Sequence, residues 1–307
     1  MDVKQEIKNY LYYCKYQKKL SQKSIKAYSI DLKQFISYFG FEEEQSLMKT
    51  GICSYISELH KIYSPKTVKR KLASLRAFLN YLEFEEIVKI NPLRLIKTKF
   101  QEPKILPKVI PLEVIEKLLL AVHQECEKAK TEYKKFSTLR DVAIIEVLFA
   151  TGMRVSELCS LKVEDINLAN GCIHIMGKGN KERMIQIGNG EVLSILSEYY
   201  QANLVRISQG GFFFINRHSS RISEQSVRFM IRSFCVKEGI SLKITPHMFR
   251  HSFATLLLEE DVDIRYIQHM LGHSSIQTTQ IYTQVTTEKQ RQILTTKHPR
   301  NKILLKN

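Results

Sequence analysis

The chain has 307 residues, a length that favours two domains. Of its residues 44% are hydrophobic and 25% charged, a balance typical of folded proteins and not of disordered chains. Its 47 Lys and Arg against 31 Asp and Glu give a net charge of +16, which favours a polyanionic partner, with nucleic acid ranked ahead of an anionic membrane surface. No apolar run approaches the roughly 20 residues that span a bilayer, and no signal peptide is evident, so we expect a cytoplasmic protein without a membrane partner.

The first third of the chain, residues 1–97, places apolar residues at helical spacing among charged ones. Helix-start residues occur at Ser21 and at Ser64, which precedes Pro65, and Gly40 is a helix-stop residue between them. This region therefore predicts about four helices. It carries 18 Lys and Arg against 10 Asp and Glu, so half of the excess positive charge lies in about a third of the chain.

The clearest of these helices spans residues 65–84 and has an apolar side and a basic side. Its apolar side consists of Val68, Leu72, Leu75, Leu79 and Leu82. A basic side of this density suits contacts with DNA phosphates, although an ordinary solvated helix surface is the alternative. The residues of this helix that we assign to DNA binding are Lys66, Lys69, Arg70, Lys71 and Arg76.

A change of pattern follows between residues 91 and 111, where four prolines alternate with basic residues. Such a stretch predicts an extended linker. We place the domain boundary near residue 100, with a helical domain at residues 1–100 and a second domain at residues 106–307.

The second domain begins with helices predicted from about Leu112 and from about Thr138, and the second of these ends at Gly152. The period of the apolar residues then changes to two at residues 172–176 and 183–187, which predicts a β-hairpin. Helical spacing returns after the hairpin and continues to the end. We therefore predict a mainly α domain with a small antiparallel sheet.

Two arginines of the second domain are suited to phosphodiester chemistry. Cleavage without a metal requires a nucleophile, donors for the non-bridging oxygens and an acid for the leaving 5′ oxygen. A guanidinium can give two parallel hydrogen bonds to a phosphate. Arg154 lies just past the predicted helix end at Gly152, and Arg250 lies at a helix start after Pro246, so both can be presented to a cleft.

The stretches around these arginines resemble known sequence boxes. Residues 150–158 and 247–255 are similar to the two arginine boxes of the tyrosine recombinase (lambda-integrase-like) family. Residues 271–283 resemble the terminal box of that family, in which a histidine, here His273, is followed nine residues later by the nucleophilic tyrosine, here Tyr282.

Lys178, in the turn of the predicted hairpin, matches the catalytic lysine of the same family. The resemblance is closest to bacterial Xer recombinases and mobile-element integrases, and it is strong over residues 138–283. The catalytic residues that it implies are Arg154, Lys178, His247, Arg250, His273 and Tyr282.

The resemblance also implies a role for each residue. Arg154 and Arg250 would bind the scissile phosphate, and His273 would add a hydrogen bond. Tyr282 would attack phosphorus to form a 3′-phosphotyrosine, with Lys178 as the acid that protonates the free 5′-hydroxyl. The reaction would need neither ATP nor another cofactor.

Several of these residues have alternative interpretations. His247, the expected general acid or base near the nucleophile, lies four residues before His251, and such a pair can ligate a metal. The stretch lacks the glutamate of a zincin, no third ligand is evident, and the six cysteines include no CxxC pair, so we predict no metal site. Lys181, otherwise assigned to DNA binding, is a rival of Lys178 as the acid.

At the level of the whole protein, the resemblance implies two domains forming a C-shaped clamp around duplex DNA. A homo-tetramer, alone or with a related recombinase, would join two double-stranded recombination sites and exchange strands through a Holliday junction in the nucleoid, with no small-molecule substrate. The segment after Tyr282 would dock into a neighbouring subunit, whereas a helix folded on its own domain is the alternative.

Two other functions remain open at this point. A type IB topoisomerase shares the Arg, Lys and Tyr chemistry but relaxes supercoils without two sites. A non-catalytic DNA-binding regulator is expected if Tyr282 is inert. The sequence also leaves open whether a recombinase of this kind resolves chromosome dimers or moves a mobile element, and which DNA sequence it recognises.

Overall fold

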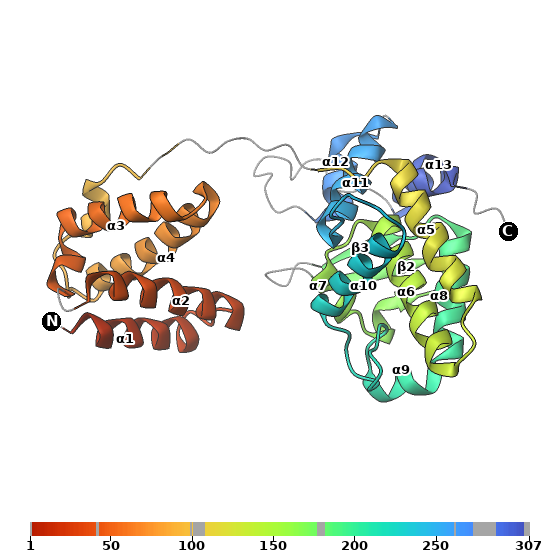
Figure 1. Ribbon diagram of the computed structural model, residues 1–307, viewed down its shortest axis with the longest axis horizontal. Coiled ribbons are helices and arrows are strands. Elements are labelled where there is room, and N and C mark those ends of the chain that lie inside the picture. Colours follow the sequence, from red (N-terminus) through yellow and green to blue (C-terminus); the bar gives the residue numbers. More distant parts are fainter. Residues whose placement is uncertain are drawn as a thin grey trace. The chain divides into compact units, whose positions relative to one another are not determined.

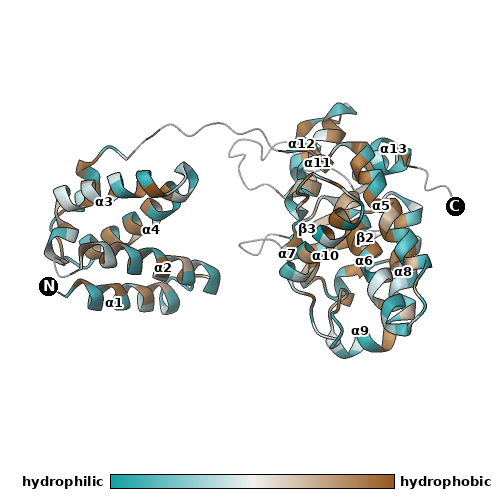
Figure 2. Cartoon of the chain, viewed as in Figure 1, coloured by the Kyte–Doolittle hydropathy of each residue, from teal (hydrophilic) through white to brown (hydrophobic). Residues whose placement is uncertain are grey.

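The computed structural model describes residues 2–40, 43–98, 100, 108–176, 182–260, 262–272 and 287–303, without the side chains of residues 43, 44 and 287–290. The chain divides into two compact units, residues 1–105 and residues 106–307 (Figure 1). Hydrophobic residues line the interior of each unit and hydrophilic residues cover its outer faces (Figure 2).

The first unit is helical throughout its described part. Its elements are α1 (Val3–Tyr16), α2 (Gln22–Phe39), η1 (Glu43–Leu47), α3 (Lys49–Ile62), α4 (Pro65–Phe84) and η2 (Pro92–Leu95). The side chain of Ser21 caps α2, and Gly40 ends it with a φ of +59°, as the sequence predicts. Apolar residues from all four α-helices form one core, including Tyr10, Leu32, Ile52 and Phe78.

The second unit is built around α6 (Glu132–Thr151), in which every residue from Val142 to Thr151 is buried. A helical segment that is buried on all sides belongs at the centre of a domain, and α6 packs against α5 (Leu112–Glu127), α8 (Gly190–Ala202) and α11 (Pro246–Glu259). The remaining helical elements are α7 (Val155–Ser160), η3 (Val163–Asp165), α9 (Leu204–Gly210), α10 (Glu224–Lys237), α12 (Ile264–Leu271), α13 (Thr287–Lys297) and η4 (Pro299–Lys302).

A three-stranded antiparallel sheet interrupts the helices, with the strand order β1 (Ile166–Asn167), β2 (Cys172–Met176) and β3 (Glu182–Gln186). Met176 pairs with Glu182, so five residues connect β2 to β3. The expected mainly α fold with a small antiparallel sheet is confirmed. No helix in the described residues is long and apolar enough to cross a membrane.

The segment from α13 to η4 packs on its own unit. Ile293 and Leu294 are buried in an apolar cluster with residues of α11 and α12, and Ile303 joins the main core. Arg300, which is 1% exposed, donates to both carboxylate oxygens of Glu146 in α6, at 2.8 and 3.0 Å. The described part of this segment, residues 287–303, therefore packs on its own unit in the single chain, and the docking into a neighbouring subunit that the resemblance implies stays a prediction.

Candidate active site

Arg154 is positioned by the sharp turn between α6 and α7. Gly152 ends α6 with a φ of +60°, and a Cβ atom there would lie 2.7 Å from the ring of Phe253, so glycine is required. Arg154 then precedes α7, and its backbone N–H donates to Glu157 Oε2 at 2.8 Å. Its guanidinium Nη1 donates to Glu157 Oε1 at 2.8 Å, while 42% of the side chain remains exposed.

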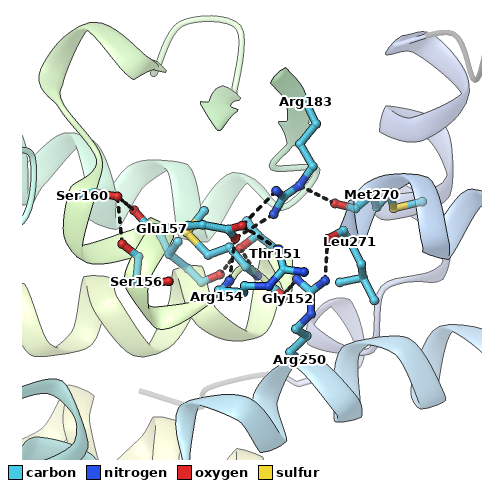
Figure 3. A network of polar contacts seen from close by, with 12 residues as sticks. Thr151, Gly152, Arg154, Ser156, Glu157, Ser160, Arg183, Arg250, Met270 and Leu271 are labelled. Atoms are coloured by element: carbon cyan, nitrogen blue, oxygen red, sulfur yellow. Dashed lines mark hydrogen bonds and ion pairs between the residues drawn. The ribbon is translucent and has the colours of Figure 1, made fainter. Parts of the chain in front are cut away.

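Arg250 reaches the same place from α11 (Figure 3). Its Nη1 donates to the Gly152 carbonyl at 3.0 Å and its Nη2 donates to the Leu271 carbonyl at the end of α12. The residue is only 3% exposed. Burial, and then the positive charge of Arg154, lower the pKa of Arg250 to about 10, so it still carries its charge at neutral pH.

Glu157 joins the arginines into one network. Both of its carboxylate oxygens accept hydrogen bonds from Arg183 of β3, at 3.0 and 2.8 Å, and Arg183 also donates from Nε to the Met270 carbonyl at 3.0 Å. Burial raises the pKa of the Glu157 carboxyl, but hydrogen bonds from Arg183 and Arg154 outweigh it and keep that pKa below its usual value. Glu157 is therefore the shared partner of Arg154 and Arg183.

His247 and His251 lie one turn apart on α11, and their ring centroids are 4.6 Å apart. Burial, followed by the charges of His247 and Arg250, lowers the pKa of His251. Within the part of the chain that the structure describes, no third His, Cys, Asp or Glu side chain joins this pair to form a metal site.

Four residues named from the sequence lie outside the described residues, namely Lys178, Lys181, His273 and Tyr282. Described residues that lie close to two of them in the sequence, Lys181 and His273, are next to the arginine network. Glu182 begins β3 one residue before Arg183, and Leu271, whose carbonyl accepts from Arg250, lies two residues before His273.

The basic residues expected to contact DNA lie on α4. Lys66, Lys69, Arg70 and Arg76 are exposed. Lys71 is different, because it is 4% exposed and its ammonium lies 3.3 Å from Asp31 Oδ1 and over the ring of Tyr63. Its assignment to phosphate binding is wrong for this conformation, since the helix turns this side chain toward α2.

Arg183 is the site residue that sequence reasoning missed. Its side chain is only 8% exposed, and its partner Glu157 lies 26 residues earlier on a different element. An arginine on a short strand of a basic chain carries no local signal for such a pair. The pairing of the two strands offers a weak signal. Arg183 lies opposite Ile175, a buried residue of β2, and paired residues point to the same face of a sheet.

Comparison with known proteins identifies the family of this chain. Residues 108–289 match the phage integrase family, and residues 7–86 match the phage integrase, N-terminal SAM-like domain. The chain therefore belongs to the phage integrase family, the tyrosine recombinases, and is an enzyme that cleaves and rejoins DNA strands in site-specific recombination.

Individual relatives cover nearly the whole chain. A tyrosine recombinase of Agathobacter rectalis is 50% identical over 294 residues, which is 96% of each chain. The tyrosine recombinase XerD of Listeria innocua is 35% identical and covers 96% of this chain and 98% of its own. The crystal structure of the XerH site-specific recombinase bound to palindromic difH substrate shares the fold, with a TM-score of 0.70 at 24% identity over 91% of this chain and 81% of that chain.

Proposed function

We propose that Tyr282 is the nucleophile of this recombinase and that Arg154 and Arg250 hold the scissile phosphate. The tyrosine oxygen forms a bond to phosphorus as the bond to the 5′ oxygen breaks, which leaves a 3′-phosphotyrosine. The phenolic proton goes to His247 as general base, and the 5′ oxygen receives its proton from Lys178, with Lys181 as the rival donor. Energy is retained in the phosphotyrosine bond, so rejoining needs no ATP.

The observation that carries this proposal is the convergence of two guanidiniums from different elements. Arg154 precedes α7 and Arg250 belongs to α11, yet Arg250 binds the carbonyl of Gly152, two residues before Arg154, and the charge of Arg154 acts on Arg250. Preorganised positive charge of this kind stabilises the extra negative charge of a pentacoordinate phosphorus. His273 would add a hydrogen bond, as the resemblance to the family implies.

We propose further that the enzyme acts on double-stranded recombination sites in the cytoplasm, on the nucleoid. XerH is known bound to difH substrate, and lambda integrase as a tetramer bound to a Holliday junction. By analogy, four copies of this chain, alone or with a related recombinase, would join two sites, and the two domains, residues 1–100 and 106–307, would both engage the duplex. The reaction serves either chromosome dimer resolution or mobile-element integration and excision.

A nicked-duplex assay tests the nucleophile. A binding site is first selected from random duplexes, and the selected site is then nicked close to the scissile phosphate so that rejoining is prevented. We expect wild-type protein to form an adduct that survives denaturation and that maps to Tyr282 by mass spectrometry. Tyr282→Phe should form none, and an undiminished adduct with this variant would refute the assignment.

The same assay separates the phosphate clamp from the rival functions. Arg154→Gln and Arg250→Gln should each slow adduct formation about 100-fold or more, as expected for loss of a transition-state donor. Relaxation of any supercoiled plasmid, without dependence on the selected site, would instead indicate a type IB topoisomerase. Absence of an adduct on a tightly bound site would indicate a DNA-binding regulator.

A further inference from the structure

Arg183 is fully engaged inside the protein. Its Nη1 and Nη2 bind the two oxygens of Glu157, and its Nε binds the Met270 carbonyl, so each nitrogen of the guanidinium has a partner. With 8% of the side chain exposed, it is not placed to contact DNA. Figure 3 shows it reaching from β3 into the space between Glu157 and the end of α12.

Arg154 uses the same carboxylate in a different way. Its guanidinium gives one nitrogen, Nη1, to Glu157 Oε1, and its backbone N–H binds Oε2. The side chain is 42% exposed, against 8% for that of Arg183. Each oxygen of Glu157 thus accepts one bond from Arg183 and one from Arg154, and only Arg154 also faces solvent.

This arrangement determines the charge offered to a phosphate. Arg154, Arg183 and Arg250 contribute three positive charges and Glu157 one negative charge, so the network carries a net +2. Without Arg183 the net charge would fall to +1, and the whole carboxylate charge would act on Arg154. A buried carboxylate then becomes a strong competitor for the guanidinium, because charges interact more strongly away from water.

We propose that Arg183 is a positioning residue that shares the charge of Glu157 and so keeps Arg154 available to the scissile phosphate. The inference rests on the proposed function, in which Arg154 binds that phosphate. It concerns a side chain that touches neither the DNA nor the nucleophile and that acts only through Glu157.

The test compares a single and a double variant in single-turnover adduct formation on the nicked duplex. Arg183→Gln should slow the adduct about 100-fold, as misplacement of a catalytic group does, with little change in the Kd for the site. The double variant Arg183→Gln/Glu157→Gln restores a net +2 and should be at least about tenfold faster than Arg183→Gln alone. Arg183→Lys keeps the charge and should retain most of the rate.

A matched control tests whether a slower adduct reflects only lost stability of the second unit. Arg140 is a partly buried arginine of the second unit, with 14% of its side chain exposed, and it pairs with Asp141 and donates to the Ile215 carbonyl, at 3.3 Å. All rates are measured well below the melting temperature of every variant. Arg140→Gln should lose stability without the loss of rate, so an equal loss of rate in this control would overturn the proposal.

Other outcomes are equally decisive. A double variant as slow as Arg183→Gln, or slower, would show that Glu157 is not the route of the effect. If Arg183→Gln does not fold, Arg183→Lys decides, and a 100-fold slower adduct with intact folding would refute charge sharing. If Arg183→Gln forms the adduct at the wild-type rate while Arg154→Gln is inactive, this inference alone is refuted. If Arg154→Gln forms the adduct at the wild-type rate, the proposed function is refuted.

Discussion

His298 is held in its neutral form by two opposite hydrogen bonds. Its Nε2 lies 3.0 Å from the Phe149 carbonyl and must donate, while its Nδ1 accepts from the Arg300 backbone N–H at 3.0 Å. A second proton on the ring would place two N–H groups against each other. Burial, and then the charge of Arg300, lower the pKa of His298 to about 4.

This neutral histidine predicts a loss of stability in mild acid. The unfolded imidazole titrates near 6.5 and the native one near 4, so stability is complete above pH 6.5 and is lost as the pH falls toward 4. Between pH 7.5 and 5 the loss from this group is about 2 kcal/mol. The variant His298→Gln keeps one donor and one acceptor but cannot take up a proton. Its stability, measured by urea unfolding, should therefore fall less than that of the wild-type protein between pH 7.5 and 5. Parallel pH dependence of the two proteins would contradict the assignment.

Single residues were predictable from the sequence where their chemistry is local. The turn after Gly152 and the start of α11 at Pro246 are visible in the sequence, and so the arginines beside them could be named. Arg183 and Lys71 could not be assigned correctly, because burial of a long basic side chain depends on a carboxylate from a distant element, here Glu157 or Asp31. Such pairs exist only after tertiary folding.

Among the elements, helices with clear ends were predicted closely. The predicted helix at residues 65–84 is α4, and Ser21 and Gly40 bound α2 as expected. The helix expected from Thr138 begins six residues earlier, at Glu132, because Thr131 caps it with its side chain. Its first turns are polar on most sides, so the apolar run used to find the helix marks only its buried half.

The end of α12 gives a prediction at this scale. Gly272 has a φ of +63°, and a Cβ atom there would lie 2.9 Å from Cδ of Arg183. Gly272→Ala should therefore cost about 1–2 kcal/mol in backbone strain and also displace Arg183. Adduct formation on the nicked duplex should slow, with calorimetry giving the loss of stability.

Gly211→Ala is the matched control for this substitution. Gly211, which ends α9, is also in the left-handed helical conformation, with a φ of +69°, and a Cβ atom there would meet no other atom within 4 Å. It should show the backbone penalty alone and keep the wild-type adduct rate. Equal rates for the two alanine variants would mean that the end of α12 does not influence the arginine network.

For the whole molecule, the net charge of +16 is the property that the sequence expresses most directly. The fold then decides which charges can meet DNA, and α4 divides its own cations between solvent and core. The mainly α architecture followed from periodicity, and the family followed from spaced boxes. The charges that reach DNA did not follow, since they depend on which side of a helix packs.

Salt dependence of DNA binding checks this division. The double variant Lys66→Gln/Lys69→Gln should make the plot of log K for DNA binding against log salt less steep. The magnitude of the slope should fall by about 0.9 for each phosphate that a lysine no longer neutralises. Lys71→Gln should leave the slope unchanged and instead destabilise the first unit, because it breaks a buried pair with Asp31. A reduced slope for Lys71→Gln, measured by fluorescence anisotropy with folded protein, would show that Lys71 reaches a phosphate after all.

The hydrogen bond from Arg250 to the Leu271 carbonyl also limits how far Tyr282 can lie from Arg250. Tyr282 follows Leu271 by eleven residues, and a chain of that length spans at most about 40 Å. A phenol confined to a sphere of that radius around one clamp arginine is present at a millimolar effective concentration. With Tyr282 as the nucleophile, as proposed above, cleavage should therefore be first order in the protein already bound at its site, and dilution of the enzyme should not dilute its nucleophile.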